Sequence, residues 1–218
     1  DSEGGTATTT LTVTVTGTND GPVSTVIPDA SHTDSEVVNL NISSYFSDPD
    51  TSDALTFSGT NLPPGLSLDL NTGLISGTLD ADASTGGPYS VTITATDPHG
   101  GTTVQTFSWV VTNVPPTAYD DFDGTTENSL VTGNGLANDV DPDNDPLIVA
   151  AVNGSTMDVA ASIAGTHGGA FTIQSDGSYT FIPGVDFDDL AVGETRSTSI
   201  RYTADDGNGG AVEATLTV

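Results

Sequence analysis

The stretch from Asn138 to Pro146 carries the densest set of potential ligands in the chain, with four carboxylates and two side-chain amides in nine residues. Carboxylates this close repel one another when ionised, so a cation among them is favourable. An all-oxygen ligand set suits a hard ion, and Ca²⁺ takes six to eight oxygens in flexible loops. In an extended loop Asp141, Asp143 and Asp145 would share one face. We therefore predict a calcium site here; the simpler alternative is a solvated acidic turn.

The charge balance limits the partners that this chain can bind. Its 218 residues include 30 Asp and Glu but only Arg196 and Arg201 as cations, for a formal charge of -28. Such a chain repels nucleic acid and anionic membrane surfaces. It does not resemble a disordered acidic tail, because hydrophobic residues make up 34% and alternate with Thr and Ser.

Cysteine is absent, which excludes disulfides and thiolate metal sites, and leaves calcium as the expected stabiliser. No apolar run approaches the length of a membrane span. No signal peptide is visible, but the chain opens on what resembles the middle of a fold. We therefore expect it to be part of a longer protein whose targeting information lies elsewhere.

Short alternating segments predict an all-β protein. Residues 8–16 alternate Thr with aliphatic residues, as in a half-buried strand, and 17–22 resemble a linker. We expect a terminal strand and linker over 1–22, one β-sandwich over 23–114 and another over 115–218. The expected strands lie near 23–27, 37–41, 54–58, 66–69, 74–77, 88–96, 102–111, 127–132, 147–152, 158–163, 169–174, 178–182, 196–204 and 211–218. A helical turn is expected around Asp186–Val192.

An Asp-x-x-Gly-Gly pattern supports this division, because it begins at Asp1, at Asp97 and, with Gly209-Gly210, at Asp206. Each copy precedes an alternating strand. The chain therefore resembles the end of one domain followed by two complete domains.

Specific motifs resemble known bacterial surface modules. Residues 40–111 are similar to the dystroglycan-type cadherin-like and putative-Ig family, on the stretches 45–50, 62–69, 71–78 and 94–101. Residues 117–218 resemble the VCBS and bacterial cadherin-like repeats of giant RTX adhesins, on 138–143, 176–181, 190–195 and 205–210. The first 23 residues resemble the end of another such repeat. The resemblance implies tandem extracellular Ig-like or cadherin-like β-sandwiches, stiffened by Ca²⁺ near their junctions.

The same resemblance implies two sets of calcium ligands. The set expected to face the preceding domain consists of Asn19, Asp20, Glu36, Asp48, Asp50 and Asp97. The set for the second domain consists of Glu127, Asp141, Asp143 and Asp206, with Asp121 and Asp139 as further candidates. The second linker, Asn113-Val114-Pro115, lacks the Asp of the family pattern. This departure weakens the expectation of a site for several calcium ions at the second junction and favours a junction held rigid by proline.

Other chemistries have weaker signals. The histidines His32, His99 and His167 are too scattered for a zinc site, and no Gly-x-Ser-x-Gly elbow marks a nucleophile. Asp97-Pro98-His99 allows self-cleavage at the Asp-Pro bond, although Asp97 also fits a structural calcium position. Paired carboxylates such as those near Asp186–Asp189 occur in glycosidases, but they also suit the first turn of a helix. The single Trp109 is expected in a core.

The function predicted from the sequence is mechanical and not enzymatic: a calcium-rigidified spacer of a secreted bacterial surface adhesin, supporting cell adhesion or biofilm formation. Its expected partners are neighbouring domains of the same or an adjacent chain, and surface glycans or proteins. Two alternatives stay open: a sugar- or peptide-binding module, and a filament subunit that donates strand 8–16 to a neighbour.

Overall fold

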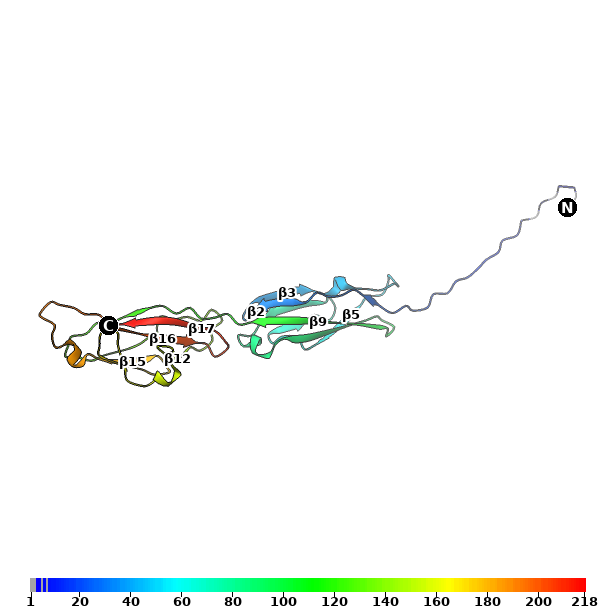
Figure 1. Ribbon diagram of the computed structural model, residues 1–218. Helices are drawn as coiled ribbons and strands as arrows, with labels where there is room; N and C mark the ends of the chain where they lie inside the picture. The colour runs from blue at the N-terminus through cyan, green and yellow to red at the C-terminus, as the bar shows by residue number, and fades with distance from the viewer. Residues whose placement is uncertain (1–2, 5, 7) are drawn as a thin grey trace.

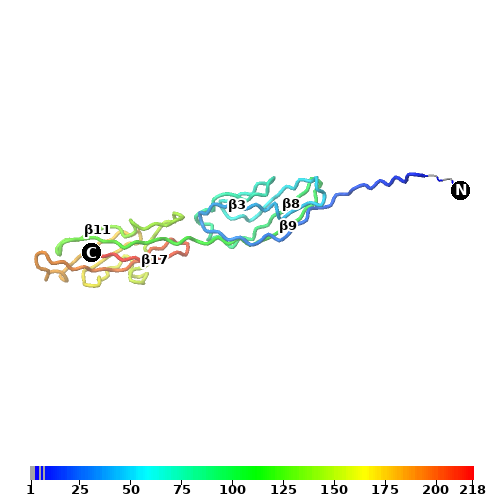
Figure 2. The backbone as a smooth tube through the Cα atoms, turned by 90° about the horizontal axis from the view of Figure 1, so that it is seen from above, coloured from blue at the N-terminus to red at the C-terminus, as the bar shows by residue number. Residues whose placement is uncertain are grey.

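The computed structural model describes residues 3–4, 6 and 8–218, and places two β-sandwiches end to end (Figures 1 and 2). The first is built from strands between residues 23 and 112, the second from strands between 121 and 217. Helical structure in the described residues is limited to the 3-10 turns η1 (Ser43–Tyr45), η2 (Ala83–Gly86), η3 (Thr156–Asp158) and η4 (Gly184–Phe187). The predicted all-β class with tandem sandwiches is confirmed.

The first sandwich packs a four-stranded sheet, in the order β2-β9-β8-β5, on a three-stranded sheet, in the order β3-β7-β6, and β1 pairs with β4. The strands are β1 (Val23–Ser24), β2 (Ala30–Thr33), β3 (Val37–Asn41), β4 (Phe46–Ser47), β5 (Thr56–Thr60), β6 (Leu66–Leu68), β7 (Leu74–Thr78), β8 (Tyr89–Thr96) and β9 (Thr102–Thr112). Alternate residues of β8 and β9 enter the core, as the period of a strand requires. Trp109 is fully buried there, as predicted.

The second sandwich packs two four-stranded sheets, in the orders β10-β17-β16-β12 and β11-β15-β14-β13. The strands are β10 (Asp121–Phe122), β11 (Val131–Asn134), β12 (Ile148–Val152), β13 (Ile163–Ala164), β14 (Ala170–Ile173), β15 (Ser178–Ile182), β16 (Ser199–Asp205) and β17 (Ala211–Thr217). Phe171, Phe181, Ile200, Tyr202 and Leu216 form its core.

Two predicted strands are absent or divided in the structure, and three observed strands were not predicted. Residues 8–16 form no strand, because no strand among the described residues pairs with them; Leu11 is 86% and Val15 88% exposed, and the segment extends away from the first sandwich (Figure 1). The strand expected at 158–163 is divided between η3 and the two-residue β13. The short β2, β4 and β10 were not predicted, because two to four residues leave little alternation to detect.

Parallel pairing fixes which end of each sandwich a residue occupies. β2 runs parallel to β9, with Thr33 opposite Thr112, and β10 runs parallel to β17, with Phe122 opposite Thr217. Residues that follow β2 or β10 therefore lie at the end of the domain where its last strand finishes. This places Glu36 and Glu127 at the ends of their domains opposite the Asp-x-x-Gly-Gly turns.

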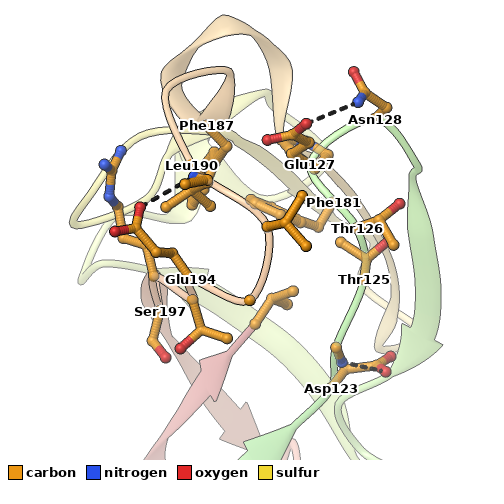
Figure 3. Close-up of a pocket in the computed structure, with 18 residues that line it drawn as sticks. Asp123, Thr125, Thr126, Glu127, Asn128, Phe181, Phe187, Leu190, Glu194 and Ser197 are labelled. Carbon is orange, nitrogen blue, oxygen red and sulfur yellow. Dashed lines mark hydrogen bonds between the residues drawn. The ribbon is translucent and has the colours of Figure 1, made fainter.

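A cavity of about 540 Å³ opens at the far end of the second sandwich (Figure 3). Asp123, Glu127 and Glu194 lie around it, and Val218 also lines it. Its aromatic residues, Phe181 and Phe187, are buried in the core beneath it. They therefore present no exposed aromatic platform of the kind that a sugar would stack on.

Candidate metal centres at the domain poles

The end of the second sandwich that faces the first carries the acidic stretch from Asn138 to Pro146. One ligand oxygen each from Asp141, Asp143 and Asp145 lies within 4.8 Å of the others. The loop is shaped by Asp141, whose Oδ1 accepts the main-chain N–H groups of Asp143 at 3.1 Å and Asp145 at 3.2 Å. Alternation in this loop therefore brings the three carboxylates together, as the sequence predicted.

Asp206 lies buried at the same pole, 4% exposed. Its Oδ1 accepts the N–H groups of Asn208 at 2.7 Å and Gly210 at 2.9 Å, and its Oδ2 accepts the Asn113 amide at 2.8 Å. A Cβ at Gly210 would lie 2.8 Å from the Cα of Pro115, so glycine is needed where the linker crosses the turn. The Asp-x-x-Gly-Gly pattern thus anchors the linker beside the carboxylate cluster.

Several oxygens of this junction cluster are buried without a hydrogen-bond partner: Asp141 Oδ2, Asn113 Oδ1 and both carboxylate oxygens of Asp143. Asp143 is only 3% exposed. Burial, followed by the neighbouring Asp141 and Asp145, raises the pKa of Asp143 to about 7. The two arginines pair elsewhere, with Asp189 and Glu213. Because unpaired buried carboxylates are costly, this donor set fits a hard divalent cation.

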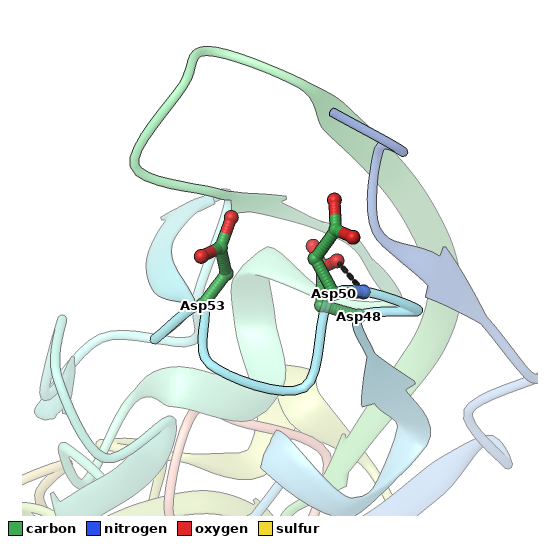
Figure 4. A group of neighbouring side chains, drawn as sticks. All are labelled: Asp48, Asp50 and Asp53. Carbon is green, nitrogen blue, oxygen red and sulfur yellow. Dashed lines mark hydrogen bonds between the residues drawn. The ribbon is translucent and has the colours of Figure 1, made fainter. Parts of the chain in front are cut away.

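The opposite pole of the first sandwich holds a second cluster, Asp48, Asp50 and Asp53, again with ligand oxygens within 4.8 Å (Figure 4). Asp48 Oδ1 accepts the Asp50 N–H at 2.8 Å, the contact that Asp141 makes with Asp143 at the junction. Asp48 Oδ2 and Asp53 Oδ2 have no hydrogen-bond partner. All three residues are half-buried.

The first linker joins this N-terminal cluster. The Asn19 amide donates to Asp97 Oδ2 at 3.1 Å, and the Asp20 N–H donates to Asp50 Oδ2 at 2.9 Å. Asp97 Oδ1 accepts from the N–H groups of His99 at 2.7 Å and Gly101 at 2.9 Å. The Asn19 bond, with these backbone bonds, lowers the pKa of Asp97. The structure therefore brings together five of the six residues predicted for this pole: Asn19, Asp20, Asp48, Asp50 and Asp97.

Glu36 does not join them. Its carboxylate accepts the Thr33 N–H at 2.9 Å, in the turn after β2 at the junction-facing end of the first sandwich. The assignment to the N-terminal pole was wrong because it overlooked β2, which carries the chain along the sandwich before Glu36.

Glu127 is likewise separated from the junction cluster, and the Asp139 carboxylate, although near that cluster, has its hydrogen-bond partners elsewhere. Glu127 accepts the Asn128 amide at 3.2 Å beside the far-end cavity, since β10 leads the chain to that end. Asp139 accepts the Tyr119 N–H at 2.8 Å and the Tyr202 hydroxyl at 3.1 Å. The same hydroxyl lies 2.9 Å from Asp121 Oδ2. Asp121 and Asp139 thus flank a core tyrosine.

The ligand sets implied by the family resemblance omitted Asp53, Asp145 and Asn113, which lie in or against the clusters. Alternation from Asp141 already pointed to Asp145, and Asp53 lies three residues after Asp50. For Asn113 the signal was its place before the second linker, equivalent to that of Asn19 before the first.

The three histidines lie apart from one another. The His32 ring contacts the Trp109 ring, with centroids 5.3 Å apart, His99 Nε2 lies 3.7 Å from Asp53 Oδ2, and His167 Nδ1 lies 2.8 Å from the Ser197 carbonyl oxygen.

In the described residues, no helix has the length and apolar character needed to cross a membrane.

Family models match almost all of the chain. Residues 21–112 match the model described as putative Ig domain, and residues 113–218 match the model described as bacterial cadherin-like domain. No curated protein sequence matches. Cadherin-like domains are extracellular and typically bind Ca²⁺.

Solved structures with similar folds include human protocadherin-24 EC1-2, with 16% identity and a TM-score of 0.38 over 92% of this chain and 98% of that chain. The endo-fucoidan hydrolase MfFcnA4 of glycoside hydrolase family 107 has 17% identity and a TM-score of 0.40 over 93% of this chain. A putative alpha-galactosidase from Bacteroides fragilis has 24% identity and a TM-score of 0.35 over 50% of this chain. This chain spans 29% and 22% of those two enzymes, respectively. The first sandwich is therefore similar to a putative Ig domain, and the second to a bacterial cadherin-like domain.

Proposed function

We propose that this chain is a calcium-stiffened spacer segment of a secreted bacterial surface adhesin of the RTX type, with a VCBS-like second domain. It would hold a distal binding domain away from the cell and so support adhesion or biofilm formation. No catalytic reaction is part of the proposal. Its partners would be neighbouring domains of the same or an adjacent chain, and the adhesin as a whole would engage surface glycans or proteins.

The observation that carries the proposal is the buried, unpartnered Asp143 carboxylate at the contact between the two sandwiches. Asp141, Asp143, Asp145 and the Asn113 carbonyl oxygen would hold Ca²⁺ there. The ion would supply the positive charge that relieves repulsion among these carboxylates. Loss of the ion would leave the pole repulsive and the linker free to bend.

A thermal melt in Ca²⁺, in EGTA and in Mg²⁺ tests this proposal. An ion that binds only the folded state adds about 2.7 kcal/mol when present at a hundredfold excess over its Kd. For domains of this size we expect a melting temperature about ten degrees higher in Ca²⁺ than in EGTA. Equal melting temperatures in all three buffers would mean that the acidic loops are solvated turns, and would remove the calcium mechanism.

The unpaired segment 8–16 favours a second candidate, a filament subunit. Leu11, Val13 and Val15 are all exposed and lie at alternate positions, so one face of the segment is apolar along its length. Such a segment can add to an open sheet edge of a neighbouring molecule. Light scattering across a concentration series would show growing assemblies for the full chain and none after deletion of residues 1–16. Monomers at all concentrations would exclude this candidate.

A further inference from the structure

The side chain of Asn208 joins the two sandwiches directly. It lies in the turn between β16 and β17, two residues after Asp206, and its Nδ2 donates to Asp145 Oδ2 at 2.5 Å. The same nitrogen donates to Asp82 Oδ1 at 3.0 Å. Asp145 belongs to the second sandwich, whereas Asp82 precedes η2 in the first. One amide group therefore bridges a carboxylate from each domain.

An amide is well suited to this position. Asn carries two N–H hydrogens and no charge, so it can bind two carboxylates without a counter-ion. Burial, followed by repulsion from Asp141, Asp82 and Asp206, raises the pKa of Asp145, and the Asn208 bond opposes this rise. Hydrogen bonds to ionised acceptors are stronger than those between neutral groups.

The N-terminal turn shows that this position is a built feature of the Asp-x-x-Gly-Gly pattern. His99 follows Asp97 as Asn208 follows Asp206, and each donates its N–H to that Asp at 2.7 Å. His99 Nε2 lies 3.7 Å from Asp53 Oδ2, as Asn208 faces Asp145. Each turn thus presents a polar side chain to the third carboxylate of its own cluster.

The other polar contacts described for the junction join the second sandwich to the linker, and not to the body of the first sandwich. Asn113 bonds to Asp206, and Pro115 packs on Gly210. Among the described residues, the Asn208–Asp82 bond is the side-chain hydrogen bond that connects the body of one sandwich with the body of the other. Without it, the linker alone would set the angle between the domains.

We propose that Asn208 is an interdomain latch that keeps the two sandwiches docked in the absence of any bound cation. The latch is separate from the proposed calcium function, since its donors are amide hydrogens already present in the chain. Stiffening of the chain would then have a cation-independent part, set by Asn208, and a cation-dependent part, set by the carboxylate cluster.

Spin-label distances on the full chain test the latch. Because the chain has no cysteine, Ser58→Cys on β5 and Thr132→Cys on β11 would each carry one label on an exposed strand position of a different domain. In EGTA we expect Asn208→Ala to lower the ratio of docked to undocked molecules about tenfold, the equivalent of one charge-assisted hydrogen bond. Asn208→Asp should lower it at least as much, because it adds a carboxylate between two others. Asn128→Ala, at the far end, is the matched control and should leave the distances unchanged.

Folding is checked separately by the NMR spectrum of the second sandwich, which Asn208→Ala should leave native-like, and by the melting temperature, which should fall no more than in Asn113→Ala, because each variant removes one hydrogen bond from a buried carboxylate. Identical distance distributions for Asn208→Ala and the unmodified chain in EGTA would overturn the latch. Repeating the measurement in Ca²⁺ separates the two proposals. If the distance distribution of the unmodified chain is no narrower in Ca²⁺ than in EGTA, calcium stiffening is contradicted and the latch is not. If Asn208→Ala leaves the distribution in EGTA unchanged, the latch is contradicted and calcium stiffening is not.

Discussion

The N-terminal pole and the junction pole are two versions of the same arrangement. In each, a linker Asn donates to a buried Asp of an Asp-x-x-Gly-Gly turn, and a glycine of that turn lies under the linker backbone. In each, the first Asp of the acidic loop accepts a hydrogen bond from the main-chain N–H two residues later. The difference lies in burial: Asp48, Asp50 and Asp53 are half-buried, whereas Asp143 and Asp145 are buried at the pole that faces the first sandwich.

That difference shows what a neighbouring domain contributes. A docked domain excludes water from the carboxylates. Because the local dielectric constant is then lower, both the repulsion among the carboxylates and their attraction for a cation are stronger. We therefore expect the junction cluster to bind Ca²⁺ more tightly than the N-terminal cluster of the same chain.

The largest difference is expected from removing one carboxylate at each pole. Asp143→Asn should abolish most of the Ca²⁺-dependent stabilisation, about 2–3 kcal/mol, because both oxygens of Asp143 are buried and available to an ion. Asp50→Asn should remove less, since its Oδ2 already accepts the Asp20 N–H. Calorimetric titration of both variants with Ca²⁺ measures the losses. Equal losses would show that burial at the junction does not set the affinity.

A Cβ under the linker should reveal how firmly each linker is held. Gly210→Ala places a Cβ 2.8 Å from both Pro115 and Pro116, and Gly101→Ala places one 2.9 Å from Gly21. Overpacking of this kind costs roughly 1–3 kcal/mol, and the stiff prolines should place Gly210→Ala at the upper end. Denaturant midpoints compare the two variants, and Gly124→Ala, with open space around its Cβ, is the control. A larger cost at Gly101 would indicate that the first linker is the more rigid.

A loss of stability as pH rises above 4 is expected in the second sandwich, which holds carboxyl groups with raised pKa values. Burial, followed by the charges of Asp139 and Asp120, raises the pKa of Asp121 to about 6, from 3.8. Between pH 4 and pH 6 the folded domain keeps a proton that the unfolded chain has lost, so stability falls as pH rises through this window. Because Asp121 is only half-buried, we expect a loss of about 1–2 kcal/mol.

Denaturation of the second sandwich at several pH values in calcium-free buffer, followed by its own NMR signals, measures this slope. Asp121→Asn should make it shallower, because the amide does not titrate, while Asp143, whose pKa is raised to about 7, maintains the remaining slope. A slope that is unchanged in this variant would assign the titration to another carboxyl group.

The sequence predicted those features that depend on local pattern. Alternation identified β8, β9, β16 and β17, and the spacing of Asp141, Asp143 and Asp145 predicted a shared face. It failed where the answer depended on pairing between distant strands. Glu36 and Glu127 were assigned to the wrong ends because two- and four-residue parallel strands carry no readable pattern, and the extended residues 8–16 look like a strand although nothing in this chain pairs with them.

The smallest difference is expected from the linker asparagines, and it isolates the contribution of the linker from that of the cation. Asn113→Ala removes the 2.8 Å hydrogen bond that the half-buried Asn113 amide donates to Asp206 Oδ2. This loss should lower the free energy of unfolding in EGTA by about 1–2 kcal/mol. Asn19→Ala removes a longer bond of 3.1 Å from an exposed side chain, so its cost should stay below about 1 kcal/mol. Melting curves in EGTA compare them. If Ca²⁺ raises the melting temperature of Asn113→Ala more than that of Asn19→Ala, the cation and the linker stabilise the same docked state at the junction. Equal increases would mean that docking of the first sandwich on the junction pole does not add to the stabilisation by the cation.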